Sequence, residues 1–273
     1  MKMGDIMTKL LKSNFYRLFK SRAFYICTIV YTGLMTLSLV LLKLLDNLFD
    51  DSSSAEEISF LNLKDGIGLG IANFSDGQVL LFLAIFISIF ITAEYTYGTM
   101  KNIVSKGFKK YKIYLSYVIT LTLAAYIMVA FCFLITTITG SIITGSIASY
   151  NGPVLLKTLR LVVIEMLLHS AITSVFVMVA MTIRSNGGVI AINICILMFG
   201  SMAYEILNLI VKNLLEIDTK LNFGDYSLQN NIYAAGQTLD NGGEIIRPIL
   251  VGLFFLVIST ALGILAFRKS DVK

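Results

Sequence analysis

The sequence predicts an all-α membrane protein with six transmembrane helices, an N-terminal amphipathic helix at the membrane interface, and both termini in the cytoplasm. Three observations support this fold class. The 273-residue chain is 56% hydrophobic and only 14% charged, whereas a soluble domain carries about a quarter charged residues. Six separate stretches have the length and apolar character of a membrane span. Lysine and arginine gather on one side of these stretches.

The six predicted spans each offer about 20 apolar residues, the length that an α-helix needs to cross the hydrocarbon layer. No water is available there for unpaired backbone groups, so only helices or closed barrels cross it. The apolar runs are continuous and lack the alternation of a barrel strand, which favours helices. The predicted spans are residues 23–45, 74–93, 113–138, 161–183, 187–211 and 248–267.

The distribution of basic residues predicts the orientation, because cytoplasmic flanks carry an excess of Lys and Arg. On the opposite side the basic residues are diluted by acids in two predicted outer loops, about 46–75 and 212–247. Both termini are therefore expected in the cytoplasm. The basic residues of the predicted cytoplasmic side are Lys2, Lys9, Lys12, Arg17, Lys20 and Arg22 before the first span, Lys101, Lys106, Lys109, Lys110 and Lys112 after the second, and Arg184, Arg268, Lys269 and Lys273 further on.

Residues 1–22 predict an amphipathic helix rather than a cleavable signal peptide, because a full-length span follows a mixed polar leader. Leu11, Phe15 and Leu18 recur with Met7 at helical spacing, and Arg17 is among the basic residues around them. This pattern is typical of a helix lying in the membrane interface. A simple membrane anchor and a role in gripping a partner both fit it.

Nucleotide-binding and metal-binding motifs are not found in the sequence. The cluster Gly66, Gly68 and Gly70 lacks the spacing of a dinucleotide-binding motif and is interpreted as flexible loop or re-entrant backbone. No G-x-x-x-x-G-K-[ST] phosphate loop occurs, and one histidine with scattered acids lacks a metal-ligand spacing. The basic residues flank hydrophobic segments, which argues against nucleic acid as a partner. No catalytic, cofactor or metal residue is therefore predicted.

The segment between the second and third predicted spans, residues 94–112, is the most informative stretch. It leaves the span on an acid, turns at a glycine, and continues as a basic, aromatic and helical link. An ordinary positively charged loop explains the lysines but not Glu94 and Gly98. A short charged helix in this place can pack in a groove of a cytoplasmic protein and transmit its motion to the spans.

This segment resembles the permeases of type-2 ABC exporters, in particular the small bacterial group that serves bacitracin resistance and lantibiotic immunity. Those permeases share an acid at the end of the second span, then Gly-Thr, a basic residue and Asn, a further Gly, basic residues, and an Ile-Tyr pair opening the third span. The matching residues here are Glu94, Gly98, Thr99, Lys101, Asn102, Gly107, Lys109, Ile113 and Tyr114.

The resemblance implies that the leader and the link contact a separate cytoplasmic ATPase dimer, with the link as a coupling helix that also includes Tyr95 and Lys110. It implies a second permease copy, identical or homologous, and a bacterial plasma membrane. ATP and Mg²⁺ would then be bound by the partner, and this chain would be a transport subunit and not an enzyme. A peptide antibiotic is the implied substrate class.

Ionisable residues inside the predicted spans are candidates for a translocation path, because such groups are costly in a bilayer. Glu165 and His169 lie four residues apart and share a helix face, and Glu205 is in the same outer half of the membrane. They fit an acidic path for a cationic peptide or a proton. A structural pairing of Glu165 with His169 or Arg160, which holds helices together, is the favoured alternative.

Three other classes of protein were weighed. An intramembrane protease needs a nucleophile with a base, or paired acids, and the spans lack both. A secondary transporter is expected to show internal repeats or broken midplane helices, which the sequence does not reveal. A membrane sensor or scaffold fits the polar outer loops but leaves the 94–112 pattern unexplained.

Overall fold

The computed structural model describes residues 3–49, 66–74, 77–145, 152–214, 222–238 and 245–270. Within these ranges the chain contains helices and no β-strand, so the predicted all-α fold class is confirmed. The elements in chain order are α1 (Met3–Lys20), α2 (Arg22–Phe49), α3 (Gly66–Phe74), α4 (Gln78–Thr96), α5 (Thr99–Ser105), α6 (Lys110–Thr144), α7 (Gly152–Ile183), α8 (Asn186–Leu214), the 3-10 helix η1 (Phe223–Tyr226), α9 (Leu228–Thr238) and α10 (Ile246–Lys269).

The chain is a multi-pass membrane protein. In the described part of the chain, α2, α4, α6, α7 and α10 are long and apolar enough to cross a bilayer. Helix α8 adds a sixth span if its two parts, which meet at a bend of 44° around residue 201, cross together. Each of the six predicted spans therefore overlaps one of these helices.

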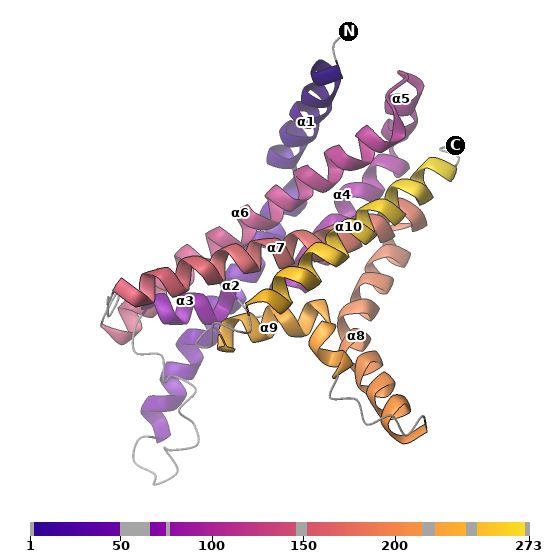
Figure 1. Ribbon diagram of the computed structural model, residues 1–273. Coiled ribbons are helices and arrows are strands. Elements are labelled where there is room, and N and C mark those ends of the chain that lie inside the picture. The colour runs from indigo at the N-terminus through magenta and orange to yellow at the C-terminus, as the bar shows by residue number, and fades with distance from the viewer. Residues whose placement is uncertain are drawn as a thin grey trace.

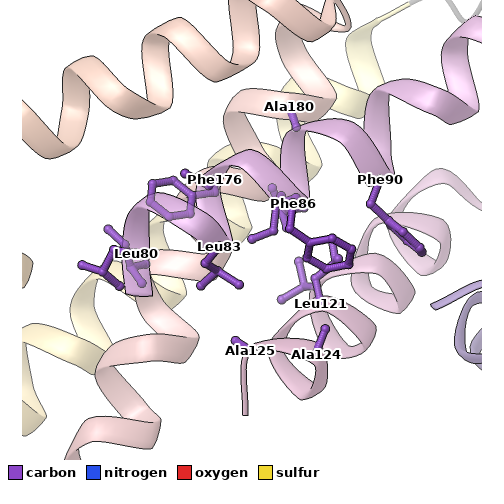
Figure 2. Close-up of a cluster of buried hydrophobic side chains, with 14 of the residues drawn as sticks. Leu80, Leu83, Phe86, Phe90, Leu121, Ala124, Ala125, Phe176 and Ala180 are labelled. Atoms are coloured by element: carbon purple, nitrogen blue, oxygen red, sulfur yellow. The ribbon is translucent and has the colours of Figure 1, made fainter. Parts of the chain in front are cut away.

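Helices α4 and α7 form the centre of the bundle (Figure 1). Among the residues of their apolar windows 61% and 67% are buried, against 22% in α10, so α10 lies at the outside of the bundle. Phe86 and Leu83 of α4 pack among residues of α6 and α7 such as Leu121 and Phe176 (Figure 2). This apolar core fixes the end of α4, where the polar residues discussed below lie.

The described parts of the regions predicted as outer loops contain the short helices α3, η1 and α9. Gly66 and Gly70 of α3 lie so close to α6 that a Cβ at either position would overlap Thr137 or Ser141. The glycine cluster is therefore a helix packed on α6, and its interpretation as a flexible loop was wrong. Gly140 supplies the facing small residue, as favours close helix approach. Residues 50–65, 75–76, 215–221 and 239–244 of the two predicted loops lie outside the described residues.

Both chain ends and α5 lie at one end of the bundle (Figure 1). Helices α1 and α2 are separated only by Ser21, whose N–H donates to the Leu18 carbonyl at 3.0 Å. The predicted leader is thus a distinct helix followed directly by the first span.

Tyr114 fixes α6 against α10. Its side chain is fully buried, and a Cβ placed on Gly263 of α10 would overlap its ring and hydroxyl. A small residue such as Gly263 lets two helices approach closely, and here it leaves room for the Tyr114 ring. The Ile-Tyr pair that opens α6 is therefore a packing element of the bundle.

We expect Gly263→Leu to destabilise the protein by about 1–3 kcal/mol, because the added side chain overpacks a filled site. Thermal denaturation of the detergent-solubilised protein measures this as a lowered Tm. Gly33→Leu is the matched control, since no atom lies within 4 Å of the corresponding Cβ position on α2. Equal Tm values for the two variants would contradict the close α6–α10 contact.

Candidate functional site

Helix α5 is set apart from the spans by two glycines in the left-handed backbone region. Gly98 has φ +68° and directly precedes α5, and Gly107 has φ +79° and follows its end. A residue with a Cβ is disfavoured in this region by roughly 1–2 kcal/mol. No atom of the described residues crowds either position, so backbone conformation explains both glycines. The chain thus turns sharply twice and presents α5 as a separate short helix.

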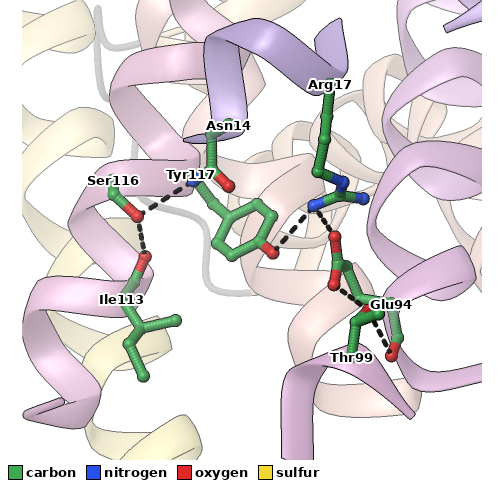
Figure 3. Close-up of polar contacts among 7 residues, drawn as sticks. All are labelled: Asn14, Arg17, Glu94, Thr99, Ile113, Ser116 and Tyr117. Atoms are coloured by element: carbon green, nitrogen blue, oxygen red, sulfur yellow. Dashed lines mark hydrogen bonds and ion pairs between the residues drawn. The ribbon is translucent and has the colours of Figure 1, made fainter. Parts of the chain in front are cut away.

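A buried carboxylate holds the junction of α4 and α5 together. Glu94, in the last turn of α4, is 1% exposed and forms an ion pair with Arg17 of α1 (Figure 3). The Thr99 hydroxyl, in the first turn of α5, donates to the same carboxylate and lies 3.2 Å from the Glu94 carbonyl oxygen. A buried charge is tolerated only when it is paired and hydrogen-bonded, and here both conditions are met.

Arg17 also connects α1 to the core. Its guanidinium donates to the Tyr117 hydroxyl of α6 at 3.4 Å and lies 5.1 Å from the centre of the Phe90 ring of α4. One turn earlier, Asn14 is buried and donates to the Ser116 hydroxyl of α6 at 3.1 Å (Figure 3). Helix α1 is therefore fastened by polar contacts to α6 and to the end of α4.

Two further contacts tie the same region to the other spans. The Arg184 guanidinium lies over the Tyr95 ring, 5.3 Å from the centre of that ring. The Tyr95 hydroxyl lies 3.4 Å from the Met181 carbonyl oxygen. The Lys110 ammonium donates to the carbonyl oxygens of Arg268 and Ser270 at 3.1 and 2.7 Å. A cation is favourable at the C-terminal end of a helix, so Lys110 caps α10. The α4–α6 link thus contacts α1, α7 and α10.

The predicted link residues differ in exposure, and Tyr95, Gly98 and Lys110 are half-buried. Glu94, Ile113 and Tyr114 are buried and hold the link in place. The exposed group forms an outward surface around α5, in which Tyr97 is 80% exposed. Its other members are Thr99, Lys101, Asn102, Lys106, Gly107 and Lys109.

The helix face that the sequence predicts as apolar in the leader is close to the face of α1 that packs against the bundle. Leu18 is fully buried, while Leu11, Phe15 and Arg17 are half-buried. Leu10 and Asn14 lie at the centre of the packed face. Sequence reasoning missed Asn14 because a polar residue does not register in an apolar pattern, although its spacing of four from Leu10 and Leu18 was a usable signal.

The ionisable residues of the spans do not form one site. Glu165 and His169 are fully buried on α7. The His169 Nδ1 lies 2.8 Å from the Glu165 carbonyl oxygen and 3.4 Å from its carboxylate, which is the structural pairing considered above. A cavity of about 160 Å³ between α6 and α7 is lined in part by His169 and Tyr126, and not by Glu205. Glu205 is exposed on α8.

Together, the fold and the junction define a multi-pass all-α membrane protein whose α4–α6 link is fastened to several spans at the end that carries both termini. The family model described as "Protein of unknown function (DUF2705)" matches residues 40–273. The chain belongs to this family. The matched region includes the whole α4–α6 link and leaves out α1. No curated protein matches the chain.

The ion pair predicts non-additive effects on stability. Arg17→Ala and Glu94→Ala should each lower the Tm, because each leaves a partly or wholly buried charge without its partner. The double variant should be more stable than the sum of the two losses implies, with a coupling energy of about 0.5–3 kcal/mol. Thermal denaturation of the four proteins measures this cycle.

Lys106→Ala is the control for that cycle, because Lys106 is an exposed cation at the same end of the bundle. Its combination with Glu94→Ala should be additive. Strict additivity of Arg17→Ala with Glu94→Ala would show that the pair does not stabilise the junction.

Proposed function

We propose that this chain is the membrane-spanning permease subunit of an ATP-driven ABC exporter, working with a separate cytoplasmic ATPase dimer and a second permease copy. The observation that carries the proposal is the position of α5. It is a short exposed helix, delimited by Gly98 and Gly107 and joined through Glu94 to α1 and through Lys110 to α10. A helix held in this way moves with the spans instead of bending away from them.

The outward surface of the link supports a role in docking. Lys101, Asn102, Lys106 and Lys109 are exposed around α5 together with the aromatic Tyr97. A mixed basic and aromatic helix fits a groove on a protein partner, where aromatic residues contribute strongly to binding. The buried contacts of Glu94 and Tyr114 would carry movement of such a partner into α4 and α6. We assign α5 as the coupling helix and α1 as its support.

ATP and Mg²⁺ belong to the partner in this proposal, because the whole sequence lacks a phosphate-binding loop. The positive-inside rule favours a cytoplasmic location for the lysine-rich end with α5 and both termini. We therefore propose a bacterial plasma-membrane location with the N- and C-termini inside. The resemblance favours a peptide antibiotic or another amphipathic compound as the substrate.

Gly98→Leu and Glu94→Ala are expected to abolish coupling while leaving membrane insertion intact. The tagged wild-type chain, purified from its native membrane, should bring with it an ATPase whose MgATP hydrolysis changes when a peptide antibiotic is added. The Gly98→Leu chain should be inserted at the wild-type level, but its purified complex should lose the response to the peptide.

Gly187→Leu is the matched control, because Gly187 is exposed in the first turn of α8 and its backbone φ is not in the left-handed region. This variant should keep the response. Wild-type behaviour of Gly98→Leu would remove α5 from the coupling route, and the absence of any associated ATPase would refute the exporter assignment.

A further inference from the structure

A groove between α1 and α4 runs beside the Arg17–Glu94 ion pair. It encloses about 280 Å³ and has two chemically different walls. The α1 wall is polar and is formed by Tyr16, Arg17, Lys20 and Ser21. The α4 wall is apolar and is formed by Ile89, Phe90 and Ala93. The groove is therefore polar on its α1 side and apolar on its α4 side.

The polar wall carries a positive charge that the ion pair does not neutralise. Glu94 is buried and is paired with Arg17. The Lys20 ammonium lies 4.7 Å from the centre of the exposed Tyr16 ring and is itself exposed. Arg22 adds an exposed cation one residue beyond Ser21. None of the described residues that line the groove is acidic, so its free charge attracts an anion.

The apolar wall lies where a span meets the membrane interface. Ile89, Phe90 and Ala93 belong to the last two turns of α4, within the window that is long and apolar enough to cross the bilayer. A ligand in this groove meets hydrocarbon-like side chains on one side and lysine and serine on the other. An anionic phospholipid has this division, with a phosphate next to its acyl chains.

We propose that the α1–α4 groove binds one anionic phospholipid, with its phosphate beside Lys20 and Ser21 and an acyl chain along Ile89 and Ala93. Basic residues near a membrane surface attract anionic lipids, and the groove also provides an apolar wall against which an acyl chain can pack. The lipid then packs beside Arg17 and helps to hold α1 against α4. This inference goes beyond the export proposal and does not depend on an ATPase.

The absence of tryptophan from the sequence makes the test direct. Tyr16→Trp places the sole tryptophan on the polar wall and keeps an aromatic face under Lys20. The full chain is reconstituted in phosphatidylcholine vesicles containing an equal fraction of either dibrominated phosphatidylglycerol or dibrominated phosphatidylcholine. Bromine quenches tryptophan on contact, so the anionic lipid should quench more strongly, with an apparent preference of about fivefold per contributing cation.

Lys20→Gln in the Tyr16→Trp background should reduce this preference by about fivefold. Lys106→Gln, which removes an exposed cation at the same end but outside the groove, should leave it unchanged. Leu81→Trp, an exposed position near the other end of α4, should show no preference. Ile89→Trp on the apolar wall gives a second reporter if Tyr16→Trp does not fold.

Equal quenching by the two brominated lipids would overturn the proposal. So would a preference that survives Lys20→Gln, or one that Lys106→Gln reduces equally, because either result would indicate general attraction to a charged bilayer surface. None of these measurements uses ATP or an exported substrate, so their failure would leave the coupling proposal standing.

Discussion

The ion pair between Arg17 and Glu94 is the interaction on which the arrangement at this end of the bundle depends. Glu94 is buried in the last turn of α4, where the helix dipole already disfavours a negative charge. Its burial adds a desolvation cost. Arg17 and Thr99 offset both effects, but only if α1 lies against α4 and α5 begins directly after Gly98. The charge of one side chain thereby fixes the positions of three helices.

The rest of the link follows from that constraint. Once α5 begins at a fixed point, Gly107 and the Lys110 cap on α10 determine where α6 starts. Tyr114, one turn into α6, then meets Gly263 of α10. The link is thus a short chain of fixed contacts between α4 and α10, which is a suitable arrangement for transmitting a displacement through a membrane domain.

Hydrophobicity and charge were sufficient to predict the spans, because a bilayer imposes its thickness on every segment that crosses it. They were not sufficient for α3 or for the bend in α8. Three glycines lower helix propensity in a short segment, and only contact with α6 explains why α3 is helical.

The importance of Glu94 and Gly98 was readable in the local pattern. The pairing of Glu94 with Arg17, and of Arg17 with Tyr117, was not readable in the sequence, because pairing over such distances in sequence depends on tertiary packing. The sequence likewise showed that Glu165 and His169 share a helix face, but it did not show whether that face points into the bundle.

The two left-handed glycines also have a consequence for how this family varies. Among the described residues, no atom crowds a Cβ at Gly98 or Gly107, so a relative can change the exposed residues of α5 other than Thr99 and still present the helix in the same place. The two glycines thus fix the position of α5, while its exposed side chains can vary. Divergence between relatives is then expected between the glycines and not at them, which makes the pair a more durable marker of this link than the helix it encloses.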